Sequence, residues 1–173
     1  MGKNFKALLG TVKAFAFDVD GVFSHNVYLH SSGEMMRSMN IKDGYAVQYA
    51  VKKGYPVAVI TGGNSDAIRM RFEYLGVKDI YMKSHNKVND FNDFLLRYDL
   101  KAEQILYMGD DLPDYEIMKI AGIPTCPADA AEEIKALAKY ISYKTAGEGC
   151  VRDVIEQVLR VQGSWLQPES FVW

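Results

Sequence analysis

The sequence predicts an α/β fold in which a parallel sheet carries helices on both faces. Short apolar runs of strand length alternate along the 173 residues with longer segments whose apolar residues recur three and four positions apart. This alternation is typical of parallel strands that are joined by helices. The first run, Ala14 to Phe17, is apolar throughout, which predicts a strand buried on both faces. The expected architecture is therefore a Rossmann-like parallel sheet.

The elements follow one another in a regular order. Strands are expected at residues 13–18, 56–60, 79–82, 104–109, 123–126 and 140–143. Helices are expected at residues 43–53, 64–75, 87–98 and 151–161. In the second of these helices, Ile68, Phe72 and Leu75 fall on one stripe. Asp43 is a good N-cap for the first helix, and either Asn64 or Ser65 caps the second.

One segment departs from this alternation. Residues 25–41 form two extended arms around a Ser-Ser-Gly turn, which predicts a β-hairpin inserted after the first strand. The sequence has no repeat and no long linker, so residues 1–162 are expected to form a single domain. Residues 163–173 are expected to be a C-terminal tail, whose large aromatic residues are either disordered or dock as a lid into the site of an adjacent subunit.

The composition excludes several classes of partner. The net charge is −2, which provides no basic surface for nucleic acid. No apolar run approaches the ~20 residues that a membrane span needs, and the N-terminus lacks the apolar region of a signal peptide. Cys126 and Cys150 are far apart in unlike contexts, which is typical of idle thiols in the cytosol. We therefore expect a cytoplasmic protein without nucleic-acid or membrane partners.

Polar motifs follow the predicted strands at the points where these strands end. Asp18-Val19-Asp20-Gly21 follows the first strand, and the two-residue period of a strand puts both aspartates on one side. Thr61, Gly62, Gly63 and Asn64 follow the strand at 56–60 and lead into a helix, where free N–H groups suit an anion such as phosphate.

Two further motifs complete the set. Lys87 opens the helix after the strand at 79–82, and the segment "GDDLPD" after residue 108 contributes Asp110, Asp111 and Asp114. Because parallel strands present their carboxyl ends at one edge, all these side chains are expected to converge. Five carboxylates and one lysine would repel one another without a hard cation, and oxygen ligands without His or Cys favour Mg²⁺. A metal beside a phosphate site implies phosphoryl chemistry.

Each motif alone has an ordinary interpretation as a turn, a solvated loop or a surface lysine, but their order is informative. The ordered set resembles the haloacid dehalogenase superfamily of phosphohydrolases, from Val12 to about Gln162. The resemblance implies that Asp18 is the nucleophile, which forms an aspartyl-phosphate. It also implies that Asp20 is the general acid and then the general base, and that its main-chain carbonyl binds Mg²⁺.

The resemblance assigns the remaining motif residues as well. Thr61 would hydrogen-bond the phosphoryl oxygens, together with the loop that contains Gly62, Gly63 and Asn64. Lys87 would pair with the nucleophile and the phosphate. The metal ligands would be Asp18, Asp20 and Asp110, and Asp111 and Asp114 would support them or orient Lys87.

The chain has no room for the cap domain that many members of this superfamily carry. In this form, with "KDG", "ITGGNS", "R…LGV" and "GEGCVRD" in order, it resembles the 3-deoxy-D-manno-octulosonate (KDO) 8-phosphate phosphatases. Those enzymes act in lipopolysaccharide biosynthesis and are tetramers in which the hairpins assemble and one subunit covers the site of the next. The resemblance implies the same assembly here, with Arg71 reaching the substrate or a neighbouring subunit.

Two departures bear on the substrate. Gly63 stands where many of those phosphatases have arginine, and Glu148 stands where they commonly have lysine. Both cations would suit the carboxylate of a sugar acid. KDO 8-phosphate is the expected substrate, and 2-keto-3-deoxynononate 9-phosphate is the alternative. A second alternative is a non-catalytic oligomerisation module, related to the domain fused to sialic-acid cytidylyltransferases.

Overall fold

The structure, a computed structural model, describes residues 5–171. All six predicted strands form, and they are β1 (Ala14–Phe17), β4 (Val57–Ile60), β5 (Asp79–Tyr81), β6 (Ile105–Met108), β7 (Ile123–Cys126) and β8 (Tyr140–Ile141). The predicted helices are α2 (Ile41–Lys52), α3 (Asp66–Tyr74), α4 (Lys87–Arg97) and α7 (Cys150–Val161). The remaining α-helices of the described residues are α1 (Phe5–Leu8), α5 (Tyr115–Ile120) and α6 (Glu132–Leu137).

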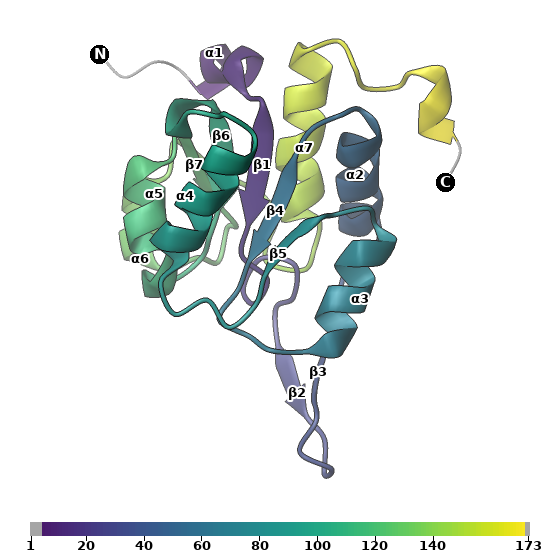
Figure 1. The fold of residues 1–173 in the computed structure, drawn as a ribbon, viewed down its shortest axis with the longest axis vertical. Coiled ribbons are helices and arrows are strands. Elements are labelled where there is room, and N and C mark those ends of the chain that lie inside the picture. Colours follow the sequence, from purple (N-terminus) through teal and green to yellow (C-terminus); the bar gives the residue numbers. More distant parts are fainter. Residues whose placement is uncertain (1–4, 172–173) are drawn as a thin grey trace.

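The six strands form one parallel sheet in the order β5-β4-β1-β6-β7-β8. The helices cover both faces, with α2, α3 and α7 on one side and α4, α5 and α6 on the other (Figure 1). After β1 the chain forms β4 and β5 on one side of this strand, and it then crosses over to form β6, β7 and β8 on the other side. The strand order therefore reverses at β1. In open sheets of this kind, the crevice beside that point is where ligands bind.

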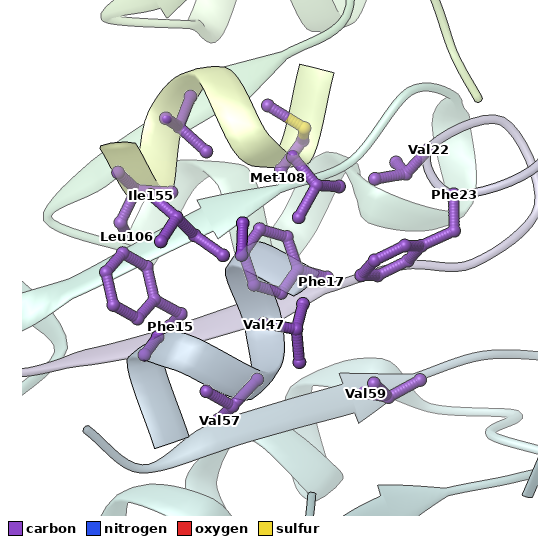
Figure 2. Close-up of a cluster of buried hydrophobic side chains, with 14 of the residues drawn as sticks. Phe15, Phe17, Val22, Phe23, Val47, Val57, Val59, Leu106, Met108 and Ile155 are labelled. Atoms are coloured by element: carbon purple, nitrogen blue, oxygen red, sulfur yellow. The ribbon is translucent and has the colours of Figure 1, made fainter. Parts of the chain in front are cut away.

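Alternate residues of β1 pack into two separate cores, because successive side chains of a strand point to opposite faces. Phe15 and Phe17 face α2 and α7 and join a cluster that includes Val47 and Ile155 (Figure 2). Ala14 and Ala16 face the other helices, and their small size leaves space for the aromatic residues of α4. All four residues of β1 are buried, as the sequence predicts. This rigid central strand fixes the position of the residues that follow it.

The predicted hairpin is present as β2 (Val27–Leu29) and β3 (Met35–Arg37), an antiparallel pair. It projects beyond the edge of the sheet at the end where β1 finishes (Figure 1). Its strands are largely exposed although their residues are mostly apolar. Because exposed apolar side chains on a projecting element are costly in water, this surface is suited to contact with another protein surface.

The start of α2 differs from the prediction. Helix α2 begins at Ile41, and its N-cap is Asn40, whose side chain accepts a hydrogen bond from the Lys42 N–H. Asp43 is therefore not the N-cap. It is fully buried inside the helix, and its Oδ1 accepts a hydrogen bond from the Arg152 N–H at 2.7 Å. The carboxylate thus satisfies a free donor at the start of α7, whose own N-cap is Gly149.

The described part of the C-terminal tail packs on its own chain. Trp165 contacts the ring of Tyr49 edge-on, and the Tyr49 hydroxyl donates to the Ser164 carbonyl at 2.9 Å. These contacts place residues 163–171 against α2 and α7, at the end of the molecule away from the hairpin (Figure 1). Residues 172 and 173 lie outside the described range. A lid function for the tail in a neighbouring subunit stays a prediction.

Within residues 5–171, every helix is too short or too polar to cross a membrane.

Candidate active site

The four polar motifs meet at one edge of the sheet. Asp18 follows β1, Thr61 follows β4, Asp110 comes shortly after β6, and Lys87 is the first residue of α4. They surround a cavity of about 460 Å³. Its walls include the predicted residues Asp18, Asp20, Thr61, Gly62, Gly63, Lys87, Asp110, Asp111 and Asp114. The convergence that the sequence predicts is therefore present.

Lys87 links two of the carboxylates. Its Nζ lies 3.0 Å from Oδ2 of Asp18 and 2.7 Å from Oδ1 of Asp114. Asp114 is further held by the Tyr107 hydroxyl, which donates to Oδ1 at 2.6 Å, and by the Asp110 N–H, which donates to Oδ2 at 3.0 Å. Because both oxygens of Asp114 are occupied by donors, this residue fixes Lys87 and the Asp110 loop.

The charges of this network change the acidity of its members. Burial, together with the charge of Asp114, raises the pKa of Asp18 to about 8, although Lys87 opposes this rise. Burial and Asp114 also raise the pKa of Asp110 to about 7. Burial would lower the pKa of Lys87, but the charges of Asp18 and Asp114 raise it on balance. The cluster therefore has too little positive charge for its carboxylates.

The donor set fits a divalent cation. Oxygens of Asp18, Asp110 and Asp114 lie within 4.8 Å of one another. Because donors occupy both carboxylate oxygens of Asp114, Asp18 and Asp110 are the carboxylates best placed to hold a metal. Carboxylate oxygens with no sulfur or imidazole ligand are the donor type that Mg²⁺ prefers.

Two glycines allow this close approach. Gly21 has a positive φ of 88°, and a Cβ at this position would meet the carboxylate of Asp110. A Cβ at Gly109 would meet the side chain of Asp114. Any larger residue at either position would displace a carboxylate of the cluster. The glycines therefore belong to the site as much as the acids do.

The loop after β4 is held in place by its neighbours. Thr61 is buried, and its Oγ1 accepts the Gly63 N–H at 3.1 Å. The main-chain carbonyls of Thr61 and Gly63 accept the N–H groups of Ser84 and Lys83. Helix α3 starts at Asp66 with Ser65 at its N-cap position, although without a side-chain bond, so Asn64 is not the cap.

Three predicted residues lie in less central positions. Asn64 is exposed and does not line the cavity. Arg71 lines a separate hollow beside the hairpin rather than the cavity around Asp18. Asp111 is exposed, and its Oδ1 accepts the Leu112 N–H at 2.8 Å, so it caps its own turn rather than holding Lys87.

Sequence reasoning missed two residues that contact the site. Arg37, at the end of β3, forms an ion pair with Asp20. No local pattern could identify it, because the contact depends on how the hairpin folds back over the sheet. Tyr107 lies in the apolar strand β6 and donates to Asp114. Its signal was available, since the hydroxyl of a fully buried tyrosine requires a partner.

The comparisons with known proteins agree with this geometry. The sequence model of the haloacid dehalogenase-like hydrolase family matches residues 64–155. The curated relative 3-deoxy-D-manno-octulosonate 8-phosphate phosphatase KdsC of Salmonella typhi is 33% identical over 153 residues, which are 88% of this chain and 81% of that protein. The chain belongs to the haloacid dehalogenase-like hydrolases.

Solved structures place this hydrolase close to the same enzymes. The 3-deoxy-D-manno-octulosonate 8-phosphate phosphatase of Yersinia pestis matches with a TM-score of 0.91 and 28% identity, over 95% of this chain and 89% of that chain. The phosphatase of the same name from Moraxella catarrhalis matches with a TM-score of 0.90 and 28% identity, over 95% of each chain. The crystal structure of that protein contains magnesium, phosphate and KDO.

Proposed function

We propose that this hydrolase removes the phosphate from 3-deoxy-D-manno-octulosonate 8-phosphate with the help of Mg²⁺. The observation that carries the proposal is the buried Lys87, which binds both Asp18 and Asp114 beside the free carboxylate of Asp110. The relatives of Salmonella typhi and Yersinia pestis carry this activity in their names, and the magnesium in the Moraxella catarrhalis structure supports the choice of metal.

In the proposed mechanism, a carboxylate oxygen of Asp18 attacks the phosphorus atom, and the bond from phosphorus to the sugar oxygen breaks. Asp20 gives its proton to that oxygen as the alcohol leaves. Asp20 then takes a proton from water, which attacks the phosphorus of the aspartyl-phosphate and releases phosphate and Asp18. The partly exposed position of Asp20, with 37% of its side chain accessible, suits exchange of protons with water and substrate.

Other residues of the site would hold the phosphoryl group. Thr61 Oγ1 and the main-chain N–H groups of its loop would bind the phosphoryl oxygens. Lys87 would offset their negative charge, with Asp114 as its fixed anchor. Mg²⁺, when bound by Asp18, Asp110 and the main-chain carbonyl of Asp20, supplies the positive charge that keeps Asp18 ionised beside an anionic substrate.

We also propose a cytoplasmic homotetramer in which a neighbouring subunit covers the open site. The exposed apolar residues of the hairpin support this assembly, above all Leu29, which is 81% exposed. Arg71 borders the hairpin and would contact either the substrate or the neighbouring subunit. Glu148 does not line the cavity around Asp18 in its own chain; it lies just before Gly149, the N-cap of α7.

The test is phosphate release by the purified protein with Mg²⁺. We expect turnover of the eight-carbon acid phosphate to exceed that of 2-keto-3-deoxynononate 9-phosphate. Asp18→Asn is expected to reduce turnover at least about 1,000-fold, because an amide oxygen is a poor nucleophile. Asp99→Asn is the matched control, since Asp99 is exposed beyond the end of α4.

The outcomes separate the alternatives. A preference for the nine-carbon substrate would replace the eight-carbon assignment. Failure to hydrolyse a panel of sugar phosphates would favour the non-catalytic module. Full turnover by Asp18→Asn would exclude Asp18 as the nucleophile.

A further inference from the structure

Arg37 joins the hairpin to the active site. Its Nε lies 2.5 Å from Oδ1 of Asp20, and its Nη2 lies 2.9 Å from Oδ2 of the same residue. The third nitrogen, Nη1, donates to the Met35 carbonyl at 3.2 Å. Only 6% of the Arg37 side chain is exposed. The guanidinium is therefore held in place with its carboxylate-binding edge toward the cavity.

The Asp20 carboxylate occupies the position that a carboxylate ligand would take. Two parallel N–H donors bound to two carboxylate oxygens is the arrangement by which arginine recognises free carboxylates. The other buried cation of the site, Lys87, is already bound to Asp18 and Asp114. Arg37 differs from it because its main partner is Asp20, a group that must be free to reach the substrate in the proposed mechanism.

Arg37 also lines a second hollow. This hollow has a volume of about 380 Å³ and is lined by Arg37, Arg71, Glu34 and methionines of the hairpin, while Asp20, the partner of Arg37, lines the cavity around Asp18. Among residues 5–171, no hydrogen bond or ion pair to the Arg71 guanidinium is present, and the Arg71 main-chain carbonyl accepts the Leu75 N–H. The hollow therefore offers two guanidinium groups against the single carboxylate of Glu34.

Gly63 lies beside the ion pair of Arg37 and Asp20. A Cβ at this position would lie 3.5 Å from Arg37 Nη2 and 3.5 Å from Asp20 Oδ2, and 3.3 Å from Thr61 Oγ1. A longer side chain there would occupy the space beside the ion pair. Gly63 therefore places no side chain between Thr61 and the ion pair of Arg37 and Asp20.

The proposed substrate has an anion at each end. An octulosonate 8-phosphate carries its carboxylate at one end of the carbon chain and its phosphate at the other. With the phosphate between Asp18 and Thr61, we place the carboxylate end of the substrate on the side of Arg37. When the substrate carboxylate replaces the Asp20 carboxylate on Arg37, the guanidinium stays paired. Asp20 is then free to turn toward the sugar oxygen.

We propose that Arg37 binds the carboxylate of the sugar acid and thereby selects acid phosphates over neutral phosphate esters. This inference rests on the proposed function. It also supplies a cation beside position 63, which is a glycine in this chain.

The experiment compares kcat/KM for KDO 8-phosphate with kcat/KM for a neutral ester, glucose 6-phosphate, with Mg²⁺ at saturation. Arg37→Gln is expected to lower the ratio of the two values about 10- to 100-fold, mainly through the KM of the acid phosphate, since a charge-assisted pair is lost. Arg37→Lys is expected to restore part of the ratio, because the charge returns without the paired donors. Hydrolysis of glucose 6-phosphate by each variant reports that it is folded.

Arg97→Gln is the control, since Arg97 also pairs with an aspartate, Asp93, but on the outer surface of α4. It is expected to keep the wild-type ratio. An equal loss on both substrates in Arg37→Gln, or no loss on either, would overturn the role of Arg37 while the proposed function stands. A wild-type protein that does not prefer the acid phosphate would overturn the proposed function and this inference together.

Discussion

Lys87 is the residue around which the carboxylates of the site are arranged. Asp18 approaches it from the end of β1 and Asp114 from the 3-10 helix Leu112–Asp114 after β6, and Asp110 lies beside them. Buried charges of this kind are tolerated only when they are paired, because a buried charge without a partner costs several kcal/mol. The cluster is thus built to accept further positive charge, which the raised pKa values of Asp18 and Asp110 reflect.

Magnesium is therefore expected to stabilise the protein more at about pH 8 than at about pH 5. The pKa values of about 8 for Asp18 and about 7 for Asp110 exceed those of an unfolded chain, so both groups hold protons more tightly when folded. Without metal, the free energy of unfolding attributable to these groups falls as the pH rises from about 4 to about 8. A bound cation offsets this fall.

The measurement is the shift in Tm on addition of Mg²⁺ at the two pH values. Asp110→Asn is expected to lose most of the shift, and Asp99→Asn is expected to keep it. Equal shifts at both pH values in the wild-type protein would contradict the interpretation of the cluster.

At the scale of elements, α2 and α7 support the loop that carries Asp20. Asp43 of α2 binds the Arg152 N–H in the first turn of α7. The Val22 carbonyl in turn accepts the Gly147 N–H of the loop before α7 at 2.9 Å and the thiol of Cys150, the first residue of α7, at 3.3 Å. The second oxygen of Asp43, Oδ2, is buried without a partner among the described residues. Asp43 therefore has a structural role at some distance from the substrate.

Asp43→Asn is expected to flatten the pH dependence of stability. Burial raises the pKa of Asp43 to about 6, although hydrogen bonds from the main chain of Arg152 and Gly149 oppose the rise. The folded chain thus binds this proton more tightly, and its contribution to stability is lost as the pH rises from about 4 to about 6. Relative to wild type, the variant is expected to gain about 1 to 3 kcal/mol between about pH 4 and about pH 7. Urea unfolding of both proteins at the two pH values measures this difference. An equal change in the free energy of unfolding with pH in wild type and variant would contradict it.

The sequence predicts elements better than it predicts their contacts. The six strands and four long helices have apolar runs and stripes that local patterns detect, whereas α5 and α6 have six residues each, too few to show a helical stripe. Asp43 resembles an N-cap, but its burial against α7 depends on tertiary packing that propensity cannot report. The motif residues could be placed at one edge because parallel strands require it, while Arg37 reaches Asp20 from a hairpin whose orientation no local signal specifies.

At the scale of the whole molecule, the proposed assembly explains both the open site and the exposed apolar hairpin. Within residues 5–171, no cap domain covers the cavity, and the exposed apolar strands β2 and β3 project from the end of the sheet where β1 finishes (Figure 1), with Arg37 of β3 in contact with Asp20 of the cavity wall. A neighbouring copy that buried the hairpins would cover both features. The outward-facing hairpin is thus the part of the chain most sensitive to assembly.

Leu29→Glu is expected to dissociate the assembly, since a charge in a packed apolar contact leaves it unpaired on association. Light scattering at micromolar concentration measures the mass. Leu96→Glu is the matched control, because Leu96 on α4 is 82% exposed and Leu29 is 81% exposed. A monomeric wild-type protein would contradict the assembly, and so would a Leu29→Glu variant with unchanged mass.

The central claim is that Asp18 is phosphorylated during turnover. The most direct measurement is mass spectrometry of the protein quenched in acid during hydrolysis of KDO 8-phosphate with Mg²⁺. The account predicts a phosphoryl group on Asp18, which is absent before substrate is added and after substrate is exhausted. A phosphoryl group on another residue, or steady turnover in an enzyme that never carries one, would contradict it.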